Sequence, residues 1–362
     1  MAIDGMGLGG AEMVVRDLAR SVDRDRFEVS ICCTKGLGPT GAALVREGVD
    51  VFVLPQRHGK GVDYLTSLKL LAILRSREVD IVHTHAPSAL LDAGICKLMA
   101  PGLKAVHTFH FGNYPHLGRR TRWMECAAAR VIDRLVAVGW QQRAAIQSTY
   151  HLVDSRIGVI WNGAPTPPVG ATCSFRRDFD TGDRLLVGTI AQLIPQKGLE
   201  DLLIVARRCR DAGLPVQFVV LGDGPLRSQL EQQRRQLGLD DTVSFVGWFD
   251  NAATRALPDF DVFFQPSRWE AMSIAVLEAM AAGKAIIATR VGDNRHVLED
   301  GITGLLVESG DTDKMADALL RLSERELRDS LGKEARARFH QRFELQHMTD
   351  AYERLYAELV EG

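Results

Sequence analysis

Short apolar runs alternate with amphipathic stretches of helix length along almost the whole chain, and this alternation limits the fold more than any other feature. The runs are typical of strands buried on both faces. Strands that alternate with helices form doubly wound parallel sheets of the α/β class. We expect strands at 1–4, 27–33, 49–54, 80–85, 104–110, 135–138, 157–160, 185–190, 216–221, 243–246, 261–265 and 285–288. We expect helices at 11–21, 41–47, 64–76, 88–100, 116–134, 199–212, 226–237, 274–282, 311–322, 324–342 and 346–360.

The length of 362 residues suggests two domains. The stretch NGAPTPPVGAT, which begins at Asn162, is rich in Pro and Gly and marks the best boundary. We expect an N-terminal Rossmann-like domain over residues 1–164, whose short first strand suggests that the chain begins late. A C-terminal Rossmann-like domain follows over 165–342, and a last helix within 343–362 packs back on the first domain.

The composition excludes several classes of protein. Charged residues make up 25% of the chain and hydrophobic residues 46%, as in an ordinary globular protein. The net charge of −2 gives no overall basic character for binding nucleic acid. Six scattered cysteines without a CxxC pair favour reduced thiols over a disulfide framework. No apolar run approaches the roughly 18 residues of a membrane span, and no signal peptide is seen. We therefore expect a cytoplasmic protein.

The stretch SRWEAMSIAVLEAMAAGKAIIAT, residues 267–289, contains one charge inside an apolar helix. The helix expected at 274–282 is apolar all round, which is typical of a buried helix. A buried Glu278 then needs a partner, either a ligand or an Arg within the core. The helix start favours an anion such as phosphate. Glu270 lies just before it, although Ser267-x-x-Glu270 also fits a purely structural capping box.

The glycines near the N-terminus match a nucleotide-binding pattern only weakly. Gly5, Gly7 and Gly10 satisfy G-x-G-x-x-G, but only four residues of strand precede them. A glycine-rich turn between a strand and a helix still brings backbone N–H groups close to an anion. A tight turn without a ligand remains the alternative.

Polar residues follow several expected strands, where doubly wound sheets bind ligands. His85, His107 and His110 lie at or near strand ends, and we favour a functional role for His110 most. No pair of histidines four residues apart and no Cys partner supports zinc, so no metal site is expected. Lys197 follows the strand at 185–190 and is placed to meet a phosphate.

A basic segment opens the helix expected at 116–134. Arg119, Arg120, Arg122 and Trp123 could lie on an anionic membrane surface. An ordinary solvated helix face is the alternative.

Taken together, these motifs resemble the retaining glycosyltransferases of family 4, which have the GT-B architecture of two Rossmann-like domains facing each other across a deep cleft. The resemblance runs nearly end to end, and the order and spacing of its motifs are highly specific. The motifs are GGAE at 9–12, DIVHTH at 80–85, Thr108-Phe-His110, Asn162-Gly163, Lys197-Gly198, GDGP at 222–225, Pro266-Ser267, Glu270-x7-Glu278-Ala-Met280 and DGITGLLV at 300–307.

The resemblance implies a role for each of these positions. The first domain would hold the acceptor, with Gly9, His85 and His110 on that side, and the second would bind a nucleotide diphosphate sugar. Glu278 would hold the ribose, and Lys197 the diphosphate. Glu270 would lie near the hydroxyls of the transferred sugar, and His110 by that sugar and the acceptor. Backbone groups of Met272, Ser273, Ile274 and Gly10 would contact the donor. His110, Glu270 and Lys197 would be catalytic, and no metal or further cofactor is implied.

Several positions depart from the family pattern. Gln192 stands where an Arg is common, so one cation for the diphosphate is missing. Arg268 and Arg295 are the candidates to restore the lost charge. Lys284 replaces a usual Pro, and Gly139 a usual Ser.

The implied reaction moves a sugar to a hydroxyl acceptor with retention, in polysaccharide, lipopolysaccharide or glycolipid synthesis. Alternatives are a weak or inactive nucleotide-sugar-binding protein of the same fold, a GT-B epimerase or phosphorylase, and an NAD-dependent dehydrogenase using Gly5, Gly7 and Gly10. A glycoside hydrolase with Glu270 and Glu278 is disfavoured, because eight residues along a helix span about 12 Å. That is more than the roughly 5–9.5 Å such enzymes need.

Overall fold

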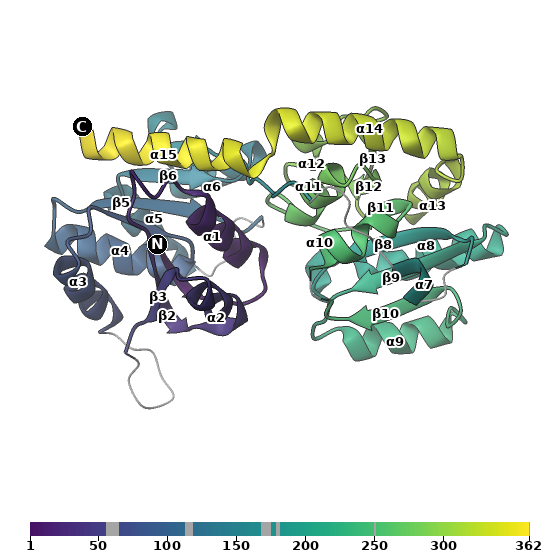
Figure 1. The fold of residues 1–362 in the computed structure, drawn as a ribbon, viewed down its shortest axis with the longest axis horizontal. Coiled ribbons are helices and arrows are strands. Elements are labelled where there is room, and N and C mark those ends of the chain that lie inside the picture. The colour runs from purple at the N-terminus through teal and green to yellow at the C-terminus, as the bar shows by residue number, and fades with distance from the viewer. Residues whose placement is uncertain (56–64, 113–118, 168–174, 179–181, 250, 362) are drawn as a thin grey trace. The chain divides into compact units, whose positions relative to one another are not determined.

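The structure is a computed structural model that describes residues 1–361 except 56–64, 113–118, 168–174, 179–181 and 250. It divides into two compact units (Figure 1). Unit 1 consists of Met1–Gly163 with Leu345–Gly362, and unit 2 of Ala164–Glu344.

Unit 1 is built on a sheet of seven parallel strands in the order β3-β2-β1-β4-β5-β6-β7. The first six follow the Rossmann order, which reverses between β1 and β4. The strands are β1 Ala2–Gly5, β2 Ser30–Gly36, β3 Asp50–Val53, β4 Ile81–Thr84, β5 Lys104–Phe109, β6 Arg134–Ala137 and β7 Ile157–Val159. The helices are α1 Gly10–Ser21, α2 Gly38–Arg46, α3 Thr66–Ser76, α4 Pro87–Met99, α5 Arg119–Val131, α6 Trp140–Tyr150 and α15 Leu345–Glu361.

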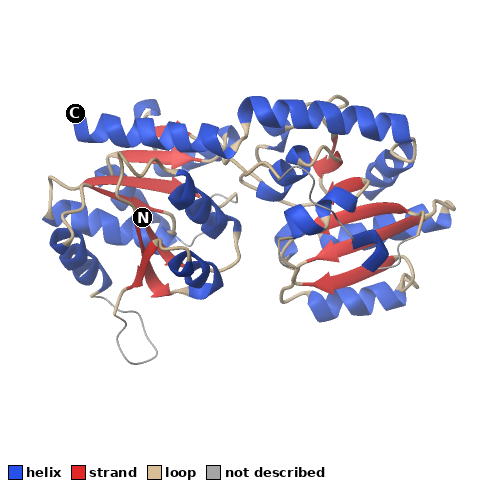
Figure 2. Cartoon of the chain, viewed as in Figure 1, coloured by secondary structure: helices blue, strands red, loops and turns tan. Residues whose placement is uncertain are grey.

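Unit 2 repeats this plan with six parallel strands in the order β10-β9-β8-β11-β12-β13, which reverses between β8 and β11. The strands are β8 Leu185–Ile190, β9 Val216–Leu221, β10 Val243–Gly247, β11 Val262–Gln265, β12 Ala285–Thr289 and β13 Leu305–Val307. The helices are α7 Phe175–Asp178, α8 Leu199–Asp211, α9 Arg227–Gln236, α10 Ala252–Arg255, α11 Ile274–Ala281, α12 Asn294–Val297, α13 Thr312–Arg321 and α14 Arg325–Arg342. The predicted α/β class is confirmed, and Figure 2 shows helices on either side of the strands in each unit.

Alternate strand residues enter different cores because successive side chains point to opposite faces of a sheet. In β2, Cys32 joins a cluster with α3, α4, α5 and α6, whereas Ile31 and Cys33 join one with α1 and α2. In unit 2, one cluster packs β8 and β9 against α8, α9 and α13. Burial on both faces explains the continuous apolar runs.

Helix α15 packs against unit 1. It contacts α1, and the Tyr356 hydroxyl lies 2.6 Å from His83 Nδ1. Figure 1 shows α15, in yellow, beside the strands of this unit. No described helix is long and apolar enough to cross a membrane.

Several element boundaries were misplaced by the sequence patterns. The strand expected at 27–33 is β2, Ser30–Gly36, because Phe27 packs its ring edge-on against Tyr356 of α15 and does not extend the strand. The helix expected at 41–47 begins at Gly38, since a Pro is tolerated in the first turn of a helix. Residues 116–118 of the helix expected at 116–134 lie outside the described residues, and α5 ends at Val131.

Candidate functional site

The strand order of unit 2 reverses between β8 and β11, and the loops after these two strands lie at the same edge of the sheet. Doubly wound sheets bind ligands at such a switch point, outside the carboxyl ends of the strands. The loop after β8 carries Gln192 and Lys197, and the loop after β11 carries Glu270. Two of the predicted site residues therefore come together from positions 73 apart in the chain.

The Glu270 carboxylate accepts three hydrogen bonds. Lys197 Nζ donates to Oε1 at 2.6 Å, Ser267 Oγ donates to the same oxygen at 2.8 Å, and Gln196 Nε2 donates to Oε2 at 3.2 Å. Glu270 is 6% exposed, whereas the Lys197 side chain keeps 22% of its surface exposed. A buried carboxylate with these donors is satisfied as an anion. The Lys197 ammonium has three protons, so it retains donors for a second anion.

The capping-box alternative for Glu270 is wrong. Helix α11 begins at Ile274, and its cap is Ser273, whose Oγ accepts from Val276 N. Ser267 instead donates to the Glu270 side chain. Glu270 also lies outside α11, so the helical spacing of about 12 Å used against a hydrolase does not apply to this pair.

Two glycines allow the loops around Glu270 to pack closely. Gly198 has φ +61°, and a β-carbon there would lie 2.2 Å from Pro266 O. Gly292 has φ +52°, and a β-carbon there would lie 2.4 Å from Glu270 O. Both positions need glycine for its left-handed backbone and for its lack of a side chain. They fix the Lys197 and Glu270 loops against each other and against the loop after β12.

A buried polar network holds the start of α11. Gln265 Nε2 donates to Ser273 Oγ at 2.6 Å, and Asn294 Nδ2 donates to Gln265 Oε1 at 2.9 Å. Asn294 Nδ2 also lies 2.9 Å from Thr289 O. The first N–H groups of a helix have no acceptor within the helix, and in α11 the cap residue Ser273 accepts from Val276 N through its Oγ. The site therefore presents backbone donors and the positive end of the helix dipole to an anion.

Helix α11 is not buried on every side as the sequence pattern suggested. Val276, Leu277, Ala279, Met280 and Ala281 are buried. Ile274, Glu278 and Ala282, which are spaced four residues apart on one face, are only partly buried, as is Ala275. Glu278 therefore stands on a stripe that solvent can reach.

Two predicted histidines meet at the carboxyl edge of the unit 1 sheet. His85 follows β4 and His110 follows β5, and His85 Nδ1 lies 3.0 Å from His110 Nε2. Their rings are stacked, with centroids 5.3 Å apart. His107 is not part of this pair. Its Nδ1 lies 2.8 Å from Thr84 Oγ1, and its ring packs edge-on against Phe109.

Burial keeps these histidines neutral. It lowers the pKa of His110 to about 4 and that of His107 to about 3. Burial also holds the pKa of His83 and His85 well below the ordinary value. At neutral pH each ring therefore donates through one nitrogen and accepts through the other.

The glycine-rich loop after β1 joins the same sheet edge to α1. Gly9 is the N-cap of α1 and Gly10 its first residue. A β-carbon at Gly10 would meet no atom within 4 Å, so the backbone here faces open space. A ligand could approach it closely.

Two family models account for most of the chain. The model described as Glycosyltransferase Family 4 matches residues 8–166, and that described as Glycosyl transferases group 1 matches residues 174–338. The chain belongs to glycosyltransferase family 4. This assignment leaves the dehydrogenase alternative without support.

Curated glycosyltransferases match this family member over most of their length. An Escherichia coli UDP-Gal:alpha-D-GlcNAc-diphosphoundecaprenol alpha-1,3-galactosyltransferase is 25% identical over 98% of this chain and 95% of its own. A Bacillus anthracis N-acetyl-alpha-D-glucosaminyl L-malate synthase is 26% identical over 82% of this chain and 80% of its own. The crystal structure of Anabaena HepE with UDP-glucose superposes with a TM-score of 0.86, at 20% identity, over 99% of this chain and 98% of that one. The fold is GT-B.

Gln192, which stands in place of the family's usual Arg, and the two candidate replacements, Arg268 and Arg295, lie in three different segments of unit 2. Gln192 is exposed in the loop after β8. Arg268 Nη2 lies 3.4 Å from Glu200 and 3.9 Å from Asp201 at the start of α8. Arg295 is exposed on α12.

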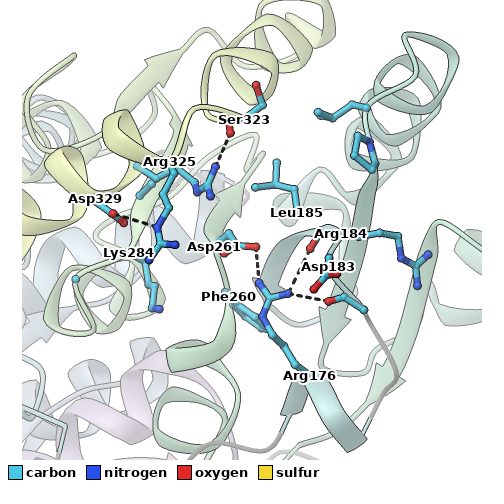
Figure 3. A pocket seen from close by; sticks show the side chains of 16 residues that line it. Arg176, Asp183, Arg184, Leu185, Phe260, Asp261, Lys284, Ser323, Arg325 and Asp329 are labelled. Atoms are coloured by element: carbon cyan, nitrogen blue, oxygen red, sulfur yellow. Dashed lines mark hydrogen bonds and ion pairs between the residues drawn. The ribbon is translucent and has the colours of Figure 1, made fainter.

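A separate basic cavity of about 620 Å³ opens at the opposite edge of the unit 2 sheet, where β8, β9, β11 and β12 begin (Figure 3). Arg176 points toward Asp261, and Arg325 toward Asp329. Lys284, which departs from the family pattern, lies in its wall. None of the predicted site residues lines this cavity.

Within the described residues, no group of three or more His, Cys, Asp or Glu side chains has the geometry to hold a metal ion. Of the Asp-x-Asp triplets in the sequence, Asp259-Phe-Asp261 is engaged by Arg176, whose backbone N–H donates to the Asp259 carboxylate and whose guanidinium donates to that of Asp261.

The sequence patterns missed the supporting residues of both sites. Gln196, Gln265 and Asn294 stand near the predicted residues of unit 2, and His83 and Tyr356 behind those of unit 1. Of these residues, only His83 belongs to a recognised motif, DIVHTH at 80–85. The others could not be found from local sequence patterns, because their contacts join distant parts of the chain.

Proposed function

We propose that this protein transfers a sugar from a nucleotide diphosphate sugar to a hydroxyl acceptor, with retention at the anomeric carbon. The observation that carries the proposal is the Lys197–Glu270 pair at the switch point of unit 2, next to the donor-rich start of α11. The Lys197 ammonium, which has protons left to donate, and the N-terminus of α11 can both bind a diphosphate.

On this proposal each donor-site residue has a separate task. Lys197 and the backbone at Met272, Ser273 and Ile274 hold the diphosphate, while Gln192 lies beside it. Glu278, on the accessible stripe of α11, accepts hydrogen bonds from the ribose hydroxyls. Glu270 both orients Lys197 and faces the hydroxyls of the transferred sugar.

The chemistry is stabilisation of a leaving group. As the anomeric bond breaks, negative charge develops on the diphosphate, and fixed donors aimed at that charge lower the barrier. The leaving phosphate itself takes the proton of the acceptor hydroxyl, while Lys197 and the helix start neutralise the leaving diphosphate in place of a metal. His110, with Gly9 and His85, forms the acceptor side in unit 1, and the backbone of Gly10 approaches the donor.

The names of the relatives suggest the substrates. A UDP-linked sugar is the first donor to try, since the E. coli relative is named for UDP-Gal and the Anabaena structure contains UDP-glucose. A lipid-linked glycan is the first acceptor to try, since the E. coli relative is named for a diphosphoundecaprenol substrate and a Rhizobium meliloti relative for lipopolysaccharide core synthesis.

A lipid-linked acceptor requires contact with the membrane surface, and we propose that α5 supplies it at the inner face of the cell membrane. Trp123 is 73% exposed and lies beside Arg122. The side chains of Arg119 and Arg120 fall outside the described residues. On the adjoining α4, Leu98 is 68% exposed. Exposed apolar groups beside cations suit an anionic membrane. Co-sedimentation with anionic and with neutral vesicles tests this, and equal binding to both would contradict it.

The runner-up is a nucleotide-sugar-binding protein of the same fold with little or no turnover, which the exposed Gln192 in place of Arg favours. A GT-B epimerase or phosphorylase is distinguished from a glycosyltransferase by measuring whether turnover depends on a hydroxyl acceptor. The runner-up predicts donor binding without product.

The test begins with thermal unfolding in the presence of a panel of UDP-, GDP- and ADP-sugars. A donor at 100 times its dissociation constant should add about 2.7 kcal/mol of stability. The stabilising donor is then incubated with lipid-linked and soluble hydroxyl acceptors, and NMR of the product shows whether the anomeric configuration is retained. Failure of every nucleotide sugar to stabilise the protein would overturn the proposal.

A further inference from the structure

The His85–His110 pair constrains where each ring carries its proton. His85 Nδ1 and His110 Nε2 lie 3.0 Å apart, so one of them donates and the other accepts. His85 is 2% exposed. Its other nitrogen, Nε2, is buried and has no hydrogen-bond partner in the described part of the chain.

The His85 ring is supported from behind by His83. Both nitrogens of His83 are engaged, Nδ1 at 2.6 Å from the Tyr356 hydroxyl and Nε2 at 2.8 Å from Thr108 Oγ1. The rings of His83 and His85 lie with centroids 4.0 Å apart at 40°. Since His83 is fixed at both nitrogens and packs on His85, it limits the tilt of that ring and holds Nδ1 toward His110.

Two arrangements of protons are available to the neutral pair. If His110 Nε2–H donates to His85 Nδ1, the proton of His85 must sit on Nε2, where it is a buried donor without a partner. If His85 Nδ1–H donates to His110 Nε2, the orphan on His85 is only a lone pair. Buried N–H groups without partners are rarer in proteins than under-satisfied acceptors. The second arrangement is therefore favoured, and it places the proton of His110 on Nδ1.

We propose that His85 is a positioning residue that fixes His110 as its Nδ1–H tautomer, so that His110 meets a substrate oxygen as a hydrogen-bond donor. This rests on the proposed function only in placing His110 at the acceptor side. The matching ligand group is a hydroxyl or phosphate oxygen of the nucleotide sugar or the acceptor. His110 then does not accept the acceptor's proton, because its only lone pair is bound to His85. The lowered pKa of His110 agrees with a poor base.

The tautomer is measured directly by NMR on the full chain labelled with ¹⁵N-histidine. Long-range ¹H–¹⁵N correlations distinguish a protonated ring nitrogen from a bare one, and loss of one set of signals in His110→Asn assigns them. In the unaltered protein, His110 should carry its proton on Nδ1 and leave Nε2 bare. A proton on Nε2 of His110 would overturn the proposal.

Two replacements of His85 separate positioning from packing. His85→Asn keeps an N–H donor near the place of Nδ1 and should preserve the His110 tautomer. His85→Leu removes the donor and should release His110 to the Nε2–H form or a mixture. An unchanged tautomer in a folded His85→Leu protein would contradict the proposal. Should that variant not fold, the measurement on the unaltered protein still decides.

Turnover provides the second readout. His85→Leu should lower kcat about tenfold or more, and His85→Asn should recover most of it. If the tautomer is as stated but no nucleotide sugar is turned over, the proposed function fails while the positioning role stands. If turnover is normal and the His110 proton lies on Nε2, the positioning role fails alone.

Discussion

Lys197 Nζ lies 2.6 Å from Glu270 Oε1, at the point where the strand order of unit 2 reverses. The pair is asymmetric, because Glu270 is buried with two further donors while Lys197 keeps part of its surface exposed. Glu270 is thus the fixed partner, and Lys197 is the cation with spare protons that faces outward.

Lys197→Ala should lower kcat by about 10²–10³-fold, since it removes a charged donor aimed at the leaving diphosphate. Glu270→Gln should lower turnover as well, because the amide no longer orients the ammonium, with about 1.5–3 kcal/mol lost from the free energy of unfolding. Steady-state kinetics and urea unfolding check both. The matched control is Glu231→Gln, which alters an Arg227–Glu231 pair of the same 2.6 Å length on α9, where both side chains are only partly buried. Variants of Lys197 or Glu270 as active as this control would contradict the site.

Glu278→Ala should weaken binding of the nucleotide sugar about 10-fold to 150-fold, the equivalent of one hydrogen bond to a charged group. Because Glu278 stands on the accessible stripe of α11, its removal should leave the fold intact. Calorimetric titration gives the affinity, and thermal unfolding without ligand gives the stability. Glu334→Gln on the exposed surface of α14 serves as control. Unchanged affinity in Glu278→Ala would remove Glu278 from the donor site.

Gln192→Arg should strengthen donor binding or raise kcat up to about tenfold, since it restores the cation common in the family to the loop after β8. Gln192→Lys should help less, because a Lys cannot bind the diphosphate in a bidentate way. Titration of the nucleoside diphosphate at two salt concentrations measures the effect, which should weaken with added salt. No gain from either variant would mean that the exposed loop lies away from the phosphates.

The buried histidines and the partly buried His110 should make the protein less stable in mild acid. Their pKa values are lowered, to about 4 for His110 and about 3 for His107, whereas an unfolded imidazole titrates near 6.5. The unfolded chain therefore binds more protons as the pH falls below about 6.5. The stability that the neutral rings contribute is complete above that pH, and up to about 1.4 kcal/mol per ring is lost for each unit below it.

Scanning calorimetry from about pH 7 to pH 5 measures this loss. His107→Asn should reduce the dependence on pH, while His347→Gln, an exposed residue of α15, should leave it unchanged. A dependence unaffected by His107→Asn would show that other groups cause it.

The sequence by itself determined most strands of the two parallel sheets and most of the helices between them, because continuous apolar strands and amphipathic helices are local patterns that each segment carries on its own. Strand β13 and helix α6 were not expected from these patterns. The order of motifs likewise sufficed for the family. The sequence did not reveal that one stripe of α11 stays accessible, since apart from Glu278 the residues of this helix are apolar on both the packed and the open face.

Only the tertiary structure decided the partners of the site residues. Lys197 meets Glu270 because β8 and β11 are neighbours in the sheet, and Gly198 lets their loops touch. His85 meets His110, and Tyr356 meets His83, because strand order and helix packing bring distant positions together. A local pattern states which side chains a segment presents, whereas hydrogen-bond partners depend on which segments the fold places beside it.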